Sequence, residues 1–232
     1  MKSNLIVVYY FGPKRRQTMQ ERLNPLFCLE SQVEFLLKYK HELDQITFVV
    51  NGDIPEGYYE AIKPLEEKHN TVTINRENVG LSYGGFAQAA SKYIEEFDFF
   101  IFLEDDWVFC HDNFDQYLFE KFKKNKNTSM VCAVSSENDP ASEKAHGKHA
   151  SVSIYCSSKD KIKEIIKKHR EFPYSPNGYV SGQQFQTNLF FHIGEVADIT
   201  DDFYVRFLDA RGEQSWGDIK NKELVTQLDF ID

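Results

Sequence analysis

One segment near the middle of the chain sets narrow limits on the fold. Five apolar residues, 99–103, run directly into the three carboxylates Glu104, Asp105 and Asp106. A continuous apolar run of this length is typical of a strand buried on both faces, as in a parallel sheet. Acids at the carboxyl end of such a strand lie where open α/β sheets bind ligands. Since close like charges repel unless a cation neutralises them, the segment favours a hard divalent metal. A solvated acidic loop is the alternative.

The first half of the chain alternates between strand and helix patterns four times. Strands are predicted over 5–11, 46–50, 71–74 and 99–103, and helices after Asn24-Pro25, over 58–68, over 86–94 and after Asp112-Asn113. This order predicts βαβ units, right-handed crossovers and a largely parallel sheet. The fold class is therefore α/β.

The second half of the chain is less regular. Strands are predicted over 130–134 and 151–156 and a helix over 159–169, while the polar stretch 135–148 is interpreted as a mobile loop or lid. No linker demands a domain boundary. We expect one domain over 1–232, with a nucleotide-binding half over 1–108 and an acceptor-binding half over 109–232.

Charge and cysteine content exclude several classes of protein. The formal net charge is -9 and the sequence pI about 5.3, which argues against unspecific binding of duplex DNA or anionic membranes. The four cysteines are far apart and form no CxxC pair, so zinc-site spacing is absent. The first apolar run is short for a signal peptide, and no stretch approaches the roughly 20 residues of a membrane span. We expect a soluble, cytoplasmic protein without a membrane span.

Three glycines precede the acidic strand. Gly80, Gly84 and Gly85 lie where a helix is predicted to begin after a strand. Glycine lets the backbone approach a ligand closely, and free N–H groups at a helix start favour phosphate. The spacing is neither G-x-G-x-x-G nor a P-loop. Tight packing of the helix on the sheet is the alternative explanation of Gly84 and Gly85.

The order of these features resembles a known family. An Arg76-x-Asn78-x-Gly80 turn, a helix, a hydrophobic strand and the acidic cluster resemble the nucleotide-sugar-binding half of GT-A glycosyltransferases, particularly the large inverting family two. The resemblance covers residues 5–108, and Glu104 departs from the D-x-D type by carrying a longer acid. It implies a GT-A-like, Rossmann-like single domain with a mostly parallel central sheet flanked by helices.

The resemblance also implies roles for individual residues on the donor side. The nucleotide site would be lined by Tyr9, Tyr10 and Phe11 beside the base, Asp53 on the base or ribose, and Arg76, Asn78, Gly80 and Gly84 around the nucleotide.

The acidic cluster would hold the metal and the sugar. Glu104 or Asp105 would face the ribose or sugar, and Asp106 would bind Mg²⁺ or Mn²⁺ directly, with Glu104 as a further candidate ligand. The metal would bridge both phosphates and neutralise the departing diphosphate. Trp107 is interpreted as a core residue under the site rather than a sugar-stacking ring.

The acceptor side calls for a general base in an inverting reaction. Glu213 is the favoured candidate, Asp201-Asp202 is another, and the stretch 181–184 offers only amides. A surface acid is the alternative for each. His111 and His192 are candidates for a further metal ligand, with a structural role as the alternative. The acceptor is expected to be a glycan, a lipid-linked sugar or a protein, and nucleic acid is not expected.

The leading hypothesis is a metal-dependent glycosyltransferase that uses a nucleotide-diphosphate sugar. A nucleotidyltransferase of related fold is the second, although such enzymes usually have a glycine-rich basic segment after the first strand and residues 12–16 are poor in glycine. The third is a non-catalytic module that binds a nucleotide or glycan.

Overall fold

The structure is a computed structural model that describes residues 1–12, 24–133, 135, 148–150, 154–174, 186–199 and 205–207. Its strands are β1 (Ser3–Tyr9), β2 (Gln45–Asn51), β3 (Thr71–Arg76), β4 (Phe99–Glu104), β5 (Trp107–Phe109), β6 (Thr128–Cys132), β7 (Ile154–Ser158), β8 (Glu195–Asp198) and β9 (Val205–Phe207). Its helices are α2 (Phe27–Lys38), α3 (Tyr58–Glu66), α4 (Leu81–Tyr93), α5 (Phe114–Lys123) and α7 (Lys159–His169).

Seven strands from both halves of the chain form one sheet in the order β3-β2-β1-β4-β7-β6-β8. The strands β1 to β4 are mutually parallel, β7 is antiparallel to both of its neighbours, and β8 is again parallel to β6. The predicted α/β fold with a mostly parallel sheet is thus confirmed. The reversal at β7 is a finding that the sequence pattern did not predict.

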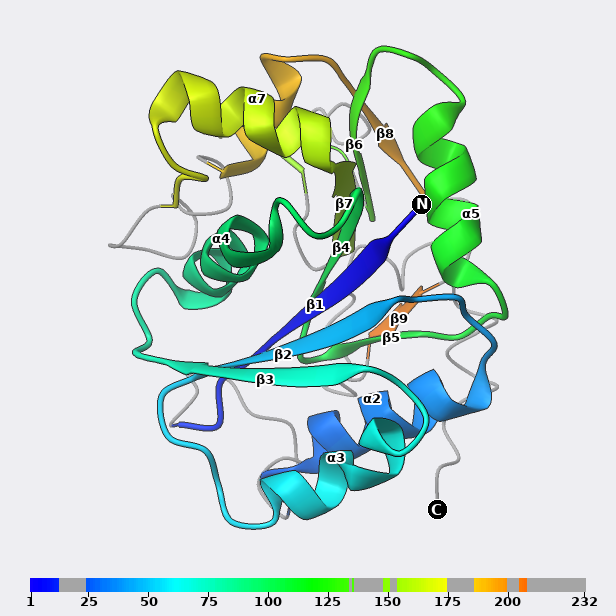
Figure 1. Cartoon of the computed structure of the whole chain (residues 1–232), viewed down its shortest axis with the longest axis vertical. Coiled ribbons are helices and arrows are strands. Elements are labelled where there is room, and N and C mark those ends of the chain that lie inside the picture. Colours follow the sequence, from blue (N-terminus) through cyan, green and yellow to red (C-terminus); the bar gives the residue numbers. More distant parts are fainter. Residues whose placement is uncertain are drawn as a thin grey trace.

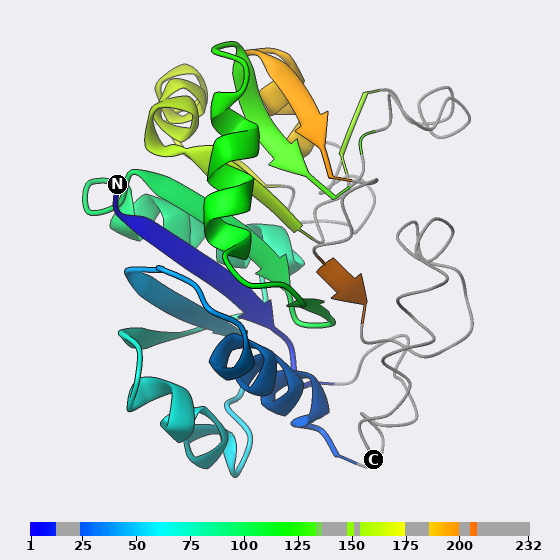
Figure 2. The same ribbon diagram turned by 90° about the vertical axis from the view of Figure 1, so that its right-hand side faces the viewer.

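Helices cover both faces of this sheet, because successive side chains of a strand point to opposite faces. In β1, Leu5 and Val7 join one core, while Ile6 and Val8 join the other. Figure 1 shows α2, α3 and α5 on one side of the sheet and α4 and α7 on the other, and Figure 2 shows α5 in front of the strands. Within the described residues, none of the helices has the length and apolar character needed to cross a membrane.

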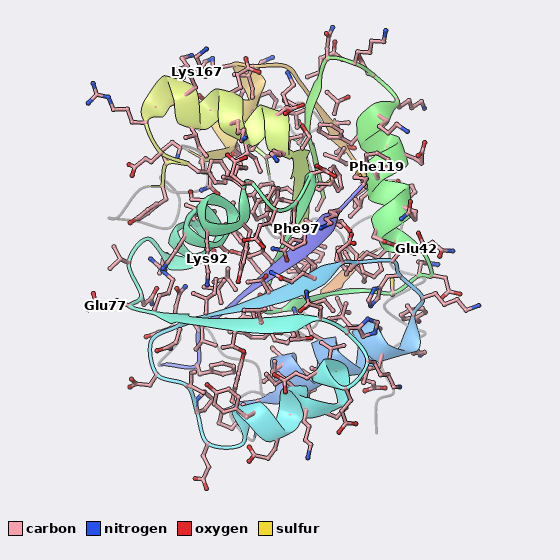
Figure 3. All side chains as sticks on the ribbon, in the orientation of Figure 1. Glu42, Glu77, Lys92, Phe97, Phe119 and Lys167 are labelled. Atoms are coloured by element: carbon pink, nitrogen blue, oxygen red, sulfur yellow. The ribbon has the colours of Figure 1, made fainter. Side chains whose placement is uncertain are left out.

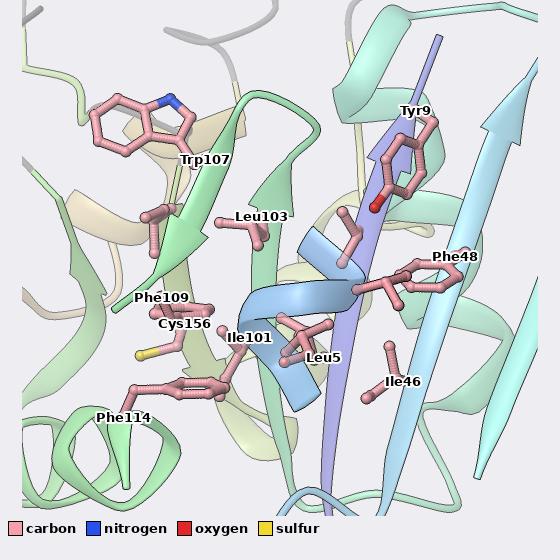
Figure 4. Packing of buried hydrophobic residues seen from close by; sticks show 14 of the residues in the cluster. Leu5, Tyr9, Ile46, Phe48, Ile101, Leu103, Trp107, Phe109, Phe114 and Cys156 are labelled. Atoms are coloured by element: carbon pink, nitrogen blue, oxygen red, sulfur yellow. The ribbon is translucent and has the colours of Figure 1, made fainter. Parts of the chain in front are cut away.

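The acidic strand is buried on both faces, as predicted. Every residue of β4 before Glu104 is at most 1% exposed, and Phe99 and Phe100 belong to different cores. After a two-residue turn the chain enters β5, which pairs with β9 in a separate two-stranded sheet. Trp107 in β5 is 7% exposed and packs in the first core, which agrees with the core role predicted for it; Figure 4 shows Leu103 between Trp107 and Tyr9.

The residues Asn24 and Asn113, whose type and position suggest helix N-caps, have different outcomes in the structure. Asn24 does not directly cap α2, whose N-cap is Leu26; instead the Asn24 carboxamide accepts from the Leu26 backbone N–H at 2.9 Å, so Pro25 lies in the turn before the helix. At α5 the N-cap is Asn113, as predicted, although its side chain makes no capping bond.

Two histidines that precede β2 and β3, His41 and His69, predict that the stability of the chain falls at acidic pH. The rings of His41 and His69 lie 4.5 Å apart, and burial lowers the pKa of each, with the neighbouring His69 lowering that of His41 further. Because the folded chain then favours the neutral rings, the free energy of unfolding should fall as the pH drops below about 6.5. Urea unfolding between pH 7.5 and 5 measures this loss, and His41→Phe should flatten it. An equal slope in both proteins would contradict the assignment.

Candidate functional site

The acidic cluster lies at the switch point of the sheet. The chain proceeds outward from β1 through β2 to β3 and then crosses back to β4 on the other side of β1. Crevices for ligands form at such points, outside the carboxyl ends of the strands. Val8 of β1 pairs with Glu104 of β4, and the Tyr10 backbone N–H donates to the Asp105 carboxylate at 3.3 Å. The ends of the two strands are therefore joined through an acid of the cluster.

Glu104 points toward the start of α4. Its carboxylate accepts a hydrogen bond from the Ser82 hydroxyl at 2.6 Å, and Ser82 lies in the first turn of that helix. The bond ties the end of the acidic strand to the helix that follows the glycine turn. Ser82 itself was not predicted, because a serine in a first helical turn is common without any function.

Arg76 fixes the turn that precedes α4. Its guanidinium donates to the Asn51 carboxamide oxygen at 2.5 Å, to the Val79 backbone carbonyl at 2.8 Å and to the Gln88 side chain at 2.6 Å. Asn51, which is 1% exposed, in turn donates to the Leu81 carbonyl at 3.0 Å. The predicted donor-site residue Arg76 thus acts on the shape of the turn, and Asn51 is a partner that the sequence did not single out.

The turn itself has the backbone that its glycine requires. Gly80 has φ 77° and is the N-cap of α4, and the Tyr174 ring lies so close that a Cβ on Gly80 would come within 2.2 Å of it. Glu77, at the entrance to this turn, is labelled in Figure 3. The Asn78 carboxamide oxygen is buried without a hydrogen-bond partner among the described residues. Tyr174, from the second half of the chain, therefore packs against the Gly80 turn.

Gly84 and Gly85 allow close packing of α4, the first against the turn before the helix and the second against the sheet. A Cβ on Gly84 would lie 2.0 Å from the Val79 carbonyl oxygen, and one on Gly85 would lie 2.9 Å from both methyl groups of Val8. The Gly84 N–H already donates to the Gly80 carbonyl at 3.0 Å within the helix. The packing on the sheet that the sequence raised as an alternative is found at Gly85, whereas Gly84 packs against the turn before the helix. The phosphate role of Gly84 stays a prediction.

The residues predicted beside the base separate into two groups. The Tyr10 ring lies near Gly52, within 3.9 Å of where its Cβ would be, and the exposed Asp53 follows directly. Phe11 instead stacks on Tyr9 with ring centroids 5.5 Å apart and packs against the first core. The structure thus places the Tyr10 ring beside Gly52, the residue before Asp53, and directs Phe11 toward the core.

The acidic turn fits a hard divalent cation that also binds substrate. Such a cation is usually held by one or two carboxylates plus substrate phosphates and water. Asp105 and Asp106, both partly buried, supply two adjacent carboxylates. No group of three or more histidine, cysteine or acidic side chains that could hold a metal occurs in the part of the chain that the structure describes.

The charge of the acidic cluster affects the pKa of two buried tyrosines, Tyr9 and Tyr155. Burial raises the pKa of Tyr9, and the Tyr58 and Asp105 side chains raise it further. Burial also raises the pKa of Tyr155, with Glu104 adding to the effect. Both phenols therefore stay protonated as hydrogen-bond donors at neutral pH.

The predicted acceptor-side residues Glu213, Asp201-Asp202 and 181–184 lie outside the described residues.

Comparison with solved structures identifies the fold. The chain is similar to a mannosyltransferase from Pyrobaculum calidifontis in complex with GDP-Man and Mn²⁺, at TM-score 0.54 and 12% identity over 86% of this chain and 55% of that one. It is also similar to glucosyl-3-phosphoglycerate synthase from Mycobacterium tuberculosis with Mn²⁺ and UDP, at TM-score 0.55 and 11% identity over 85% and 68% of the two chains.

A third similar structure belongs to another class of transferase. It is a CMP:2-keto-3-deoxy-manno-octonic acid synthetase complexed with CTP, at TM-score 0.51 and 11% identity over 86% of this chain and 89% of that one. No protein-family model and no curated sequence matches the chain. The chain therefore has the fold that nucleotide-sugar glycosyltransferases of the GT-A type share with cytidylyltransferases.

Proposed function

We propose that this chain is a metal-dependent glycosyltransferase whose donor is a nucleotide-diphosphate sugar. The observation that carries the proposal is the Asp105-Asp106 turn at the switch point, bonded to the end of β1 and preceded by Glu104, which accepts from Ser82 at the start of α4. Two carboxylates in this place suit a metal–diphosphate group. Solved structures of the same fold that contain Mn²⁺ with GDP-Man or UDP support the same reading.

The proposal gives a role to each candidate residue of the donor side that the structure describes. Asp106 would be the direct ligand of Mg²⁺ or Mn²⁺, and a bound metal would stabilise the departing diphosphate as a Lewis acid. Glu104, held by Ser82, would orient the ribose or sugar. Tyr10 and Asp53 would contact the base and ribose, and the start of α4 would face the phosphates.

The acceptor side of the proposal rests on the sequence. Glu213 remains the favoured general base, and the acceptor would be a glycan, a lipid-linked sugar or a protein hydroxyl.

The cytidylyltransferase fold relatives favour one second candidate. The similarity to the CTP-bound synthetase extends over 89% of that chain, which is more than for either glycosyltransferase above. A nucleotidyltransferase would use the same acids with a nucleoside triphosphate. The glycine-poor stretch after β1 counts against it.

Thermal unfolding with nucleotide sugars tests the proposal. UDP-, GDP-, CMP- and dTDP-sugars are compared with CTP and UTP, each with and without Mn²⁺. We expect one nucleotide-diphosphate sugar to raise Tm only with Mn²⁺, by roughly 5 °C or more at a hundredfold excess over Kd. A shift with triphosphates alone would favour nucleotidyl transfer. A shift without slow metal-dependent hydrolysis of the donor would favour a binding module, and no shift at all would refute nucleotide binding.

A further inference from the structure

A buried glutamine lies directly behind the acidic turn. Gln32, in the middle of α2, is 1% exposed and sits among the apolar residues that pack this helix on the sheet. Buried polar side chains are almost always hydrogen-bonded, because an unpaired one loses its contacts with water without replacement. The partners of Gln32 therefore indicate what the side chain does.

All of these partners belong to the ends of β1 and β4 and to the start of β5. The Gln32 amide nitrogen donates to the backbone carbonyl of Glu104 at 3.0 Å and to that of Trp107 at 2.7 Å. The Gln32 amide oxygen accepts from the Tyr9 hydroxyl. The two carbonyls stand immediately before and after Asp105-Asp106, so one side chain spans the turn that carries both carboxylates.

We infer that Gln32 is a positioning residue that fixes the Asp105-Asp106 turn for the metal–diphosphate group, an inference that rests on the proposed function. An amide is the side-chain group that offers two N–H donors and an acceptor at this length. Glutamate has the same size but would turn carboxylate oxygens toward two carbonyl oxygens. The Tyr9 hydroxyl orients the amide, since its donated bond leaves the nitrogen for the turn.

The test compares two buried glutamines, Gln32 beside the carboxyl end of β4 and Gln45 at the amino end of β2. Gln32→Met keeps the length of the side chain and removes all three bonds. The control is Gln45→Met: Gln45 is 6% exposed at the start of β2 and donates to the Thr47 hydroxyl at 2.9 Å, far from the acidic turn. Both variants lose buried hydrogen bonds and should lose stability of about 1–3 kcal/mol. Only the first should disturb the turn.

Two measurements separate positioning from a general loss of stability. Hydrogen–deuterium exchange without ligand should quicken in the peptide 104–110 for Gln32→Met and not for Gln45→Met. Titration with Mn²⁺, in the presence of the nucleotide sugar that stabilises the wild type most, should give roughly 10- to 100-fold weaker metal binding for Gln32→Met only. We also expect KM for the donor to rise more than kcat falls.

Tyr9→Phe should give a smaller loss of metal affinity in the same direction, because both bonds from the Gln32 nitrogen survive. The inference would be overturned if the peptide 104–110 exchanged equally fast in Gln32→Met and Gln45→Met. It would also be overturned if the wild type bound Mn²⁺ and Gln32→Met bound it with the same affinity. If the wild-type chain binds no Mn²⁺ with any of these nucleotide sugars, the proposed function fails and the affinity part of the inference fails with it. The exchange comparison then decides separately whether Gln32 fixes the turn.

Discussion

Asp106→Asn is expected to lower the metal-dependent hydrolysis of the donor sugar by roughly 10³-fold in kcat/KM. The amide keeps the volume of the side chain but removes the charge that we assign to the direct metal ligand. A metal contributes several kcal/mol to the stabilisation of developing negative charge, and each ~1.36 kcal/mol is a factor of ten in rate. Initial rates of nucleotide-diphosphate release over a Mn²⁺ series measure the effect, and they require no identified acceptor.

Two matched variants make this result specific. Asp112→Asn removes one carboxylate that accepts from the Lys40 backbone N–H at 2.8 Å, outside the site, and should leave the rate unchanged. Glu104→Gln retains an oxygen that can accept from Ser82 and should cost less than Asp106→Asn. If Asp106→Asn retains wild-type Mn²⁺ dependence while Glu104→Gln loses it, the metal ligand is Glu104 and our assignment of Asp106 is wrong.

The place of the acidic cluster in the fold could be predicted because two simple rules determine it. Apolar runs such as 99–103 indicate strands buried on both faces, and parallel strands bring their carboxyl ends to one edge. In the structure the ends of β1 and β4 do lie together, and the Tyr10 backbone N–H donates to the Asp105 carboxylate. The position of the acidic cluster was therefore predictable from residue order.

The parts that could not be predicted depend on direction and on partners far away in sequence. The run Ile154-Tyr155-Cys156 is equally apolar whichever way β7 points, so its reversal leaves no trace in composition. The four-residue β8 is partly exposed at the sheet edge and lacks a clear alternation. Gln32 reads as one more polar residue in a helix, and only its distant partners distinguish it from a surface position.

Gly84→Ala is expected to destabilise the chain by about 2 kcal/mol or more, although the same change in an exposed helix stabilises by roughly 1 kcal/mol. The new methyl group would lie 2.0 Å from the Val79 carbonyl oxygen and 3.0 Å from the Arg76 guanidinium. Overpacking therefore outweighs helix propensity, and the bond from Arg76 to Val79 should weaken with it. Urea unfolding should show a lower midpoint at an unchanged slope. A variant of wild-type stability that has lost donor binding would instead assign Gly84 to the phosphates.

The neighbouring glycine provides the matched control. A methyl group on Gly85 would meet the two Val8 methyl groups, which a second substitution can remove. In a double-mutant cycle, Val8→Ala should therefore recover part of the stability lost in Gly85→Ala, with a coupling of about 1 kcal/mol. The first obstacle for Gly84→Ala is a backbone oxygen, which no side-chain truncation removes, so Val8→Ala should only add its own cost there. Coupling between Gly85→Ala and Val8→Ala, together with additivity of Gly84→Ala and Val8→Ala, would establish that both glycines are required for packing, each against a different neighbour.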